Sequence, residues 1–116
     1  MKRRDILKIG AATAGALGFP AIIRAQQREV VILGLWDQTG AFADVGPLND
    51  RGMQMALEER GMKVLGRPIK YITRDGGTQA GTSTRRAEEA VDGDGARFII
   101  GPWSSGVALA VSEVAK

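Results

Sequence analysis

The segment FIIGPWSSGVALAVSEVAK, residues 98–116, contains the pattern on which the fold prediction rests. An apolar run stops at Gly101-Pro102, two serines follow, and apolar residues then recur at helical spacing from Ser104 onward. The residues that share one helix face are Val107, Ala108, Val111, Val114 and Ala115. The segment therefore predicts a short buried strand over residues 97–101, followed directly by an amphipathic helix.

The same order of strand, loop and helix occurs twice before this segment. Residues 29–36 and 69–73 are rich in β-branched and aliphatic side chains and predict strands. Residues 47–61 and 82–92 carry apolar side chains at helical spacing and predict helices. Strands that alternate with helices favour right-handed crossovers between parallel strands, so the predicted fold class is α/β with a doubly wound parallel sheet.

These patterns also predict how the elements pack. The continuous apolar run of residues 29–36 indicates a strand that is covered on both faces. The side chains expected on the inner faces of the first two helices are Met53, Ala56 and Leu57, and Ala87, Ala90 and Val91.

Composition excludes several kinds of site. The chain of 116 residues contains neither cysteine nor histidine, so Ser-His-Asp, Cys-His and His/Cys zinc sites cannot be built from it. Its sequence has no calcium-loop spacing, no GxGxxG motif and no phosphate-binding GxxxxGK[ST] loop. We therefore expect no metal and no cofactor.

The first 25 residues differ from the rest of the chain. Five basic side chains and one acid give them a charge of +4 within a total of +3, which leaves no basic excess elsewhere for nucleic-acid binding. A basic start, a short apolar middle rich in Ala and Gly, and a small residue at Ala25 predict a signal peptide over residues 1–25, cleaved near Ala25. Arg3-Arg4 resembles the twin-arginine export motif, so we expect Arg3 and Arg4 to contact the export machinery. An amphipathic first helix and an uncleaved anchor are the alternatives.

A ligand site is expected at the edge of the sheet where the parallel strands end, because ligands of open α/β sheets bind there. The segments at this edge are residues 36–46, 74–81 and 101–106. In the last of them, Ser104 and Ser105 open a helix whose first N–H groups lack partners, and such a helix start accepts a carboxylate or another anion. The alternative is that these serines only cap the helix.

Several blocks of the mature chain, taken in order, resemble the periplasmic substrate-binding proteins of ABC transporters, of the leucine/isoleucine/valine-binding type. The blocks are ILGLWDQTGAFADVG (32–46), RGMQMALEE (51–59), LGRPIKYITRDGGTQ (65–79) and FIIGPWSSGVALAVSEVA (98–115). The resemblance implies two α/β lobes that are joined by a hinge and close on a ligand. Residues 26–116 would then be the first βαβαβα part of lobe one.

The resemblance also implies which residues bind the ligand. Ser105 first, and Ser104 second, would hold the carboxylate or equivalent polar head of the ligand. The loop after the first strand would border the rest of the ligand, from Phe42 to Val45 and with Val45 in particular. Trp36 stands where the family has an aliphatic residue, so we expect it to shape the edge of the pocket.

The expected function is that of an exported, periplasmic binding protein that is not an enzyme. It would capture an amino acid, amide, urea or small organic acid and deliver this small-molecule solute to an ABC permease in the inner membrane. A ligand-sensing receptor domain and a periplasmic α/β enzyme are the alternatives. Because the sequence stops at Lys116 inside the third helix pattern, we expect it to be the first part of a longer protein and unable to bind alone.

Overall fold

The computed structural model of the chain describes residues 28–116. The expected signal peptide, with Arg3 and Arg4, lies outside the described residues.

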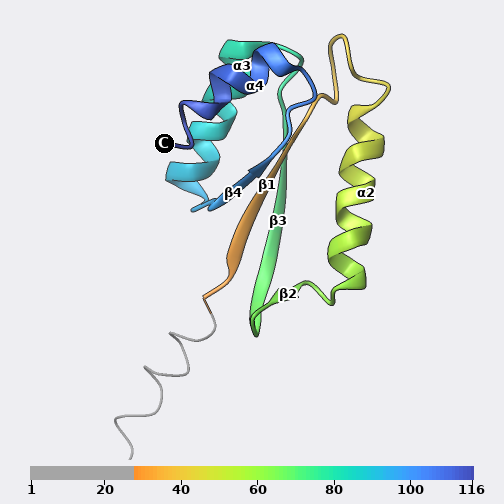
Figure 1. The fold of residues 1–116 in the computed structure, drawn as a ribbon, viewed down its shortest axis with the longest axis vertical. Coiled ribbons are helices and arrows are strands. Elements are labelled where there is room, and N and C mark those ends of the chain that lie inside the picture. The colour runs from red at the N-terminus through yellow and green to blue at the C-terminus, as the bar shows by residue number, and fades with distance from the viewer. Residues whose placement is uncertain (1–27) are drawn as a thin grey trace, which may run out of the picture.

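A four-stranded sheet with the order β2-β3-β1-β4 lies at the centre of the described chain (Figure 1). Its strands are β1 (Val30–Trp36), β2 (Lys63–Val64), β3 (Arg67–Asp75) and β4 (Phe98–Ile100). The central strand β1 pairs in parallel with both β3 and β4, whereas the short β2 pairs antiparallel with β3. The predicted α/β fold with a parallel sheet is therefore confirmed, with the addition of a β2–β3 hairpin.

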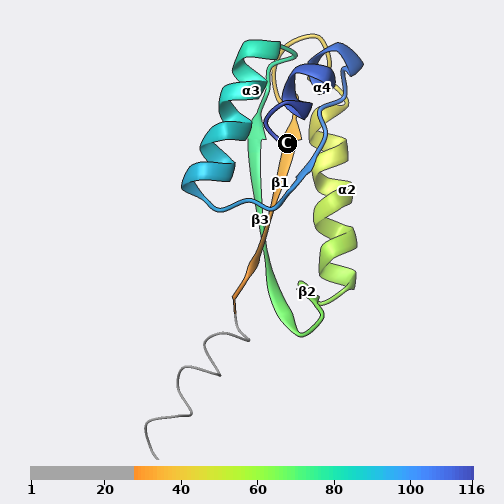
Figure 2. The same cartoon turned by 60° about the vertical axis from the view of Figure 1, so that its left-hand side comes forward.

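Helices cover the sheet unequally. Helix α3 (Ala80–Glu88), which continues into a π-helical turn (Glu89–Gly93), packs beside α4 (Ser105–Ser112) on one face (Figure 1). Helix α2 (Gly46–Glu59) lies on the opposite side, as the turned view in Figure 2 also shows. Each crossover between parallel strands thus contains a helix, which is how parallel strands are ordinarily connected.

The hydrophobic core lies between β1 and the α3–α4 pair. Alternate residues of β1 point to this side because side chains in a strand alternate between its faces. The buried residues of the core are Val31, Leu33, Leu35, Ala87, Ala90, Ala96, Val107 and Val111. The predicted inner faces of the last two helices are confirmed at Ala87, Ala90, Val107 and Val111, with Val91 and Val114 partly buried against the core. Ala108 is half-buried, and the prediction is wrong at Ala115, which is exposed beyond the end of α4.

The predicted inner face of α2 is only partly right. Leu57 is buried, but Met53 is half-buried and Ala56 is exposed. The reason is Asp50, which lies two turns before Leu57 on the same helix face and hydrogen-bonds to Tyr71 on the sheet. This polar contact turns Ala56 away from the sheet.

Candidate functional site

Three loops meet at the carboxyl edge of the sheet. They follow Trp36, Asp75 and Ile100, which end the parallel strands β1, β3 and β4. The three segments that we expected at the carboxyl edge of the sheet therefore do lie there.

Asp75 joins two of these loops. One carboxylate oxygen, Oδ1, accepts hydrogen bonds from the backbone N–H groups of Gln38 at 2.9 Å, Thr39 at 3.3 Å and Gly77 at 2.9 Å. The other, Oδ2, accepts from Thr39 Oγ1 at 2.8 Å. Burial alone would raise the pKa of Asp75, but these hydrogen bonds outweigh burial and hold the pKa below its ordinary value of 3.8. Asp75 therefore fixes the β1–α2 loop to the β3–α3 loop as a carboxylate.

Replacing Asp75 by asparagine is expected to lower the free energy of unfolding at pH 7 by about 1–2 kcal/mol, because an amide cannot accept all four bonds. The folded-state pKa is depressed, so the carboxylate stabilises the fold above the unfolded value near 3.8 and ceases to do so as the pH falls through the lower folded value. Urea titrations at pH 7 and pH 3 measure this difference. The exposed Asp44 serves as a control, since Asp44→Asn should change little at either pH. Equal effects of the two variants would contradict the role of Asp75.

Asp37 makes a second connection between the same loops. It is 1% exposed, and its Oδ1 accepts a hydrogen bond from the Thr78 backbone N–H at 2.8 Å. Gly40 has a positive φ of 86°, and a Cβ there would overlap the carbonyl oxygen of Gly77. The two loops are therefore packed backbone against backbone, and they form a rigid rim. We did not predict this structural role of Asp37. The feature that could have indicated it is the position of an acidic residue directly after a buried strand.

Ser104 and Ser105 lie where the third loop enters α4. Ser104 occupies the N-cap position with extended backbone angles, and its carbonyl oxygen accepts the first helical bond from Ala108 N at 2.8 Å. Within the described chain its hydroxyl makes no capping hydrogen bond, so helix capping does not account for the side chain. Ser105 is the first residue of α4 and is exposed. Two hydroxyl groups and the free N–H groups of the first helical turn are thus available to an anionic or polar group.

Phe42 and Val45 form the turn that leads into α2. The carbonyl oxygen of Phe42 accepts hydrogen bonds from Val45 N at 3.1 Å and Gly46 N at 3.0 Å. Val45 is the N-cap of α2, and both side chains are half-buried. They lie in the loop between β1 and α2, which we expected to border the ligand.

The side chain of Trp36 is largely buried and does not form an exposed pocket wall. Its side chain is 9% exposed, and the indole Nε1 donates a hydrogen bond to Tyr71 Oη at 2.8 Å. Because indole has one N–H group, Trp36 has no donor left for a ligand. The prediction that Trp36 shapes the edge of the pocket would therefore rest on its ring and not on a hydrogen bond to the ligand.

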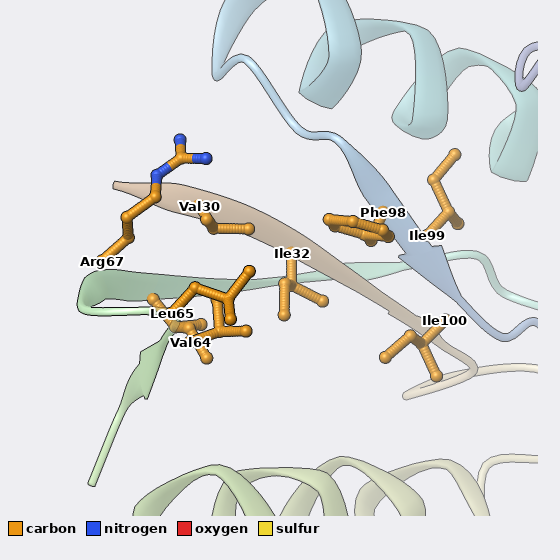
Figure 3. A pocket seen from close by; sticks show the side chains of 9 residues that line it. Val30, Ile32, Val64, Leu65, Arg67, Phe98, Ile99 and Ile100 are labelled. Atoms are coloured by element: carbon orange, nitrogen blue, oxygen red, sulfur yellow. The ribbon is translucent and has the colours of Figure 1, made fainter. Parts of the chain in front are cut away.

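A separate apolar groove of about 440 Å³ lies near the start of β1, away from the carboxyl edge. Figure 3 shows Val30, Ile32 and Phe98 along β1 and β4, with Val64 and Leu65 of the β2–β3 hairpin beside them. The lining offers a single charged side chain, Arg67, to a polar solute. No residue of α2 lines this groove. The expectation that residues 29–36 are covered on both faces is confirmed for most of the strand, since every residue of β1 except the half-buried Ile32 is buried, and it is wrong for the exposed Glu29.

Metal sites and membrane-spanning helices are absent from residues 28–116. Within this range no group of three or more acidic side chains is arranged to hold a metal ion. None of the helices described is both long enough and apolar enough to cross a membrane.

Residues 29–116 match the periplasmic binding protein family over the whole length of the strands and helices described above. The chain belongs to this family. It is 36% identical over 78 residues to the Leu/Ile/Val-binding protein BraC3 of Rhizobium johnstonii, a match that covers 66% of the chain and 21% of the relative. The resemblance drawn from the four sequence blocks is therefore confirmed.

Solved structures show the same similarity. An amino acid ABC transporter substrate-binding protein from Pseudomonas fluorescens superposes with a TM-score of 0.70 at 39% identity, covering 76% of this chain and 23% of that one. A leucine-binding protein from Thermotoga maritima superposes with a TM-score of 0.69 at 28% identity, covering 74% and 24%. The chain thus spans about a quarter of the length of these relatives, and its family is periplasmic.

Proposed function

We propose that residues 26–116 form the first part of lobe one in the solute-binding component of an ABC transporter. The observation that carries this proposal is the start of α4, where Ser104 and Ser105 have hydroxyl groups that do not cap the helix in the described chain. These groups lie at the carboxyl edge of a parallel sheet, where α/β proteins bind ligands. The names of the relatives, which bind amino acids including leucine, support the same class of solute.

In this proposal the solute is a small polar molecule, namely an amino acid, an amide, urea or a small organic acid. Ser105 and then Ser104 hydrogen-bond its polar head, with help from the positive end of the α4 dipole. Phe42 and Val45 border the remainder of the solute from the β1–α2 loop. Trp36 supports the site from beneath, since its indole N–H is already bonded to Tyr71. The loaded protein then delivers the solute to a permease in the inner membrane.

Ser105→Ala is expected to weaken solute binding by about 1–2 kcal/mol, or roughly 5- to 30-fold in Kd, because a hydrogen bond to a charged head group is lost. The measurement is calorimetric titration of the gene's full-length product with leucine, isoleucine, an amide, urea and a small organic acid. Ser112→Ala is the matched control, because Ser112 lies at the other end of α4 and its hydroxyl donates to Leu109 O at 2.7 Å. Binding that is equally strong in wild type and Ser105→Ala would remove Ser105 from the site. Failure of every solute to bind wild type would overturn the proposed function itself.

The proposal includes export. Residues 1–25 act as a signal peptide that is cleaved near Ala25, and Arg3 and Arg4 direct the chain to the twin-arginine route. The periplasmic location of the family supports export in general. The route is tested by the substitution of the arginine pair described in the Discussion.

A further inference from the structure

A chain of hydrogen bonds runs from Trp36 to helix α2. The indole Nε1 of Trp36 donates to Tyr71 Oη at 2.8 Å, and Tyr71 Oη donates to Asp50 Oδ1 at 2.8 Å. The direction is fixed, because indole N–H can only donate and a carboxylate can only accept. Tyr71 is therefore the link between a residue of β1 and a residue of α2.

Gly34 makes this link possible. Tyr71 is on β3, yet its ring extends over the neighbouring strand β1 at Gly34. A Cβ at position 34 would overlap the Tyr71 hydroxyl oxygen and would lie 2.7 Å from Trp36 Nε1. Only glycine leaves room for the hydroxyl to meet the indole. The hydrogen bond between Trp36 and Tyr71 therefore depends on glycine at position 34 of β1.

Asp50 holds the far end of the chain. Its Oδ1 also accepts a hydrogen bond from Thr73 Oγ1 at 2.9 Å, so α2 is attached to β3 at two neighbouring side chains. Burial first, and then the hydrogen bond and charge of Asp50, raise the pKa of Tyr71 to about 12 against the opposing hydrogen bond from Trp36. Tyr71 consequently remains a protonated donor at any physiological pH.

The opposite edge of the Trp36 ring reaches the loop that carries the serines. Its Cε3 atom lies 3.3 Å from the place where a Cβ of Gly101 would be. Gly101 has a positive φ of 97°, and such a Cβ would also overlap the carbonyl oxygen of Leu35. The β4–α4 loop therefore passes directly over the end of β1 and rests against the indole, three residues before Ser104.

We propose that Asp50 and Tyr71 are positioning residues for the solute site. Acting through Trp36, they set the position of the β4–α4 loop and so of Ser104 and Ser105. The inference rests on the proposed function in so far as these serines bind the solute. It adds that α2, through Asp50, controls the geometry of the serines.

Two variants separate positioning from simple attachment of α2. Tyr71→Phe removes the link between Asp50 and Trp36 and leaves the Thr73 bond intact. Thr73→Val removes one hydrogen bond to the same carboxylate oxygen and leaves the link intact. Each variant loses one bond to Asp50 Oδ1, but Tyr71→Phe also leaves the Trp36 indole N–H without its acceptor, so Tyr71→Phe should be the more destabilising of the two. Their effects on the serine loop should differ.

The first measurement is the ¹H–¹⁵N correlation spectrum of the protein. Its two indole N–H signals come from Trp36 and Trp103, and the signal that disappears in Trp103→Phe identifies the one from Trp103. Tyr71→Phe should move the indole N–H signal of Trp36 upfield and shift the amide signals of Ser104 and Ser105, whereas Thr73→Val should leave all of them in place. The second measurement is solute titration of the full-length product, in which we expect Tyr71→Phe to weaken binding about 5-fold and Thr73→Val less than 2-fold. If Tyr71→Phe does not fold, Asp50→Asn should shift the same signals in the same direction by a smaller amount.

Serine amide signals that stay in place in Tyr71→Phe, or that move equally in Thr73→Val, would overturn the inference. The outcomes also separate the inference from the proposed function. Wild type that binds no solute overturns the proposed function, while the amide shifts still decide whether Asp50 and Tyr71 position the loop. Binding that depends on Ser105 but is unaffected by Tyr71→Phe overturns only the positioning role.

Discussion

Alanine at Gly46 is expected to lower the free energy of unfolding by about 3 kcal/mol or more, the largest loss of stability that we predict for a single methyl group. Gly46 is buried as the first residue of α2, and a Cβ there would overlap the carbonyl oxygen of Asp37 and lie 2.5 Å from the carbonyl carbon. Both are backbone atoms of a loop that is fixed by Asp75, so neither can rotate away. Urea denaturation followed by circular dichroism measures the loss.

Gly52 provides the control for this prediction. It lies on the same helix, and apart from its chain neighbours and the backbone of the helix itself no atom of the described chain is within 4 Å of its Cβ position. Gly52→Ala should therefore stabilise the protein by about 0.5–1 kcal/mol, since alanine is the better residue in a helix. Opposite signs for the two substitutions are the expected result. A neutral Gly46→Ala would mean that the start of α2 is not pressed against the end of β1.

The order of elements could be predicted from the sequence because it depends on local periodicity. The alternation of strand and helix gave the parallel sheet, and the spacing of Ala87 and Ala90 gave the buried face of α3. The position of the candidate site followed from topology, since parallel strands end at one edge. Residues such as Ser104 and Ser105 could be assigned to this edge without knowledge of any contact.

The roles of Asp75 and Asp50 could not be predicted in the same way. Asp75 binds Gln38, 37 residues earlier, and Asp50 binds Tyr71, 21 residues later. Spacing along one helix or strand identifies neighbours within that element but not partners on another. The same limit explains the error at Ala56, because a polar contact across elements decided which face of α2 meets the sheet.

The incomplete coverage of β1 at Ile32 has a related cause. A continuous apolar run indicates that both faces of a strand are apolar, but it does not identify what covers each face. Val31, Leu33 and Leu35 meet α3 and α4, whereas Ile32 borders the groove beside the exposed Phe98. The position of Trp36 at the end of β1 was predicted correctly. The direction of its ring was not predictable, because it depends on contacts with Tyr71 on β3 and with the space left by Gly34.

Substituting Arg3→Lys together with Arg4→Lys is expected to abolish export almost completely. Lysine keeps the positive charge, and a signal peptide of the general secretory kind requires only a charged start. A twin-arginine signal depends on the guanidinium groups themselves, whose planar set of donors an ammonium group cannot reproduce. The substitution therefore distinguishes recognition of the arginine pair from recognition of charge.

The measurement is the fraction of the full-length product in the periplasm, with Arg24→Lys as the matched control because it makes the same exchange near the end of the proposed signal peptide. We expect Arg24→Lys to be exported like wild type and the double variant to accumulate inside the cell. If both are exported equally, the charge alone suffices, and residues 1–25 direct the protein to the general secretory route. In that case the protein would cross the membrane unfolded, and the Asp75 and Asp50 contacts would form only in the periplasm.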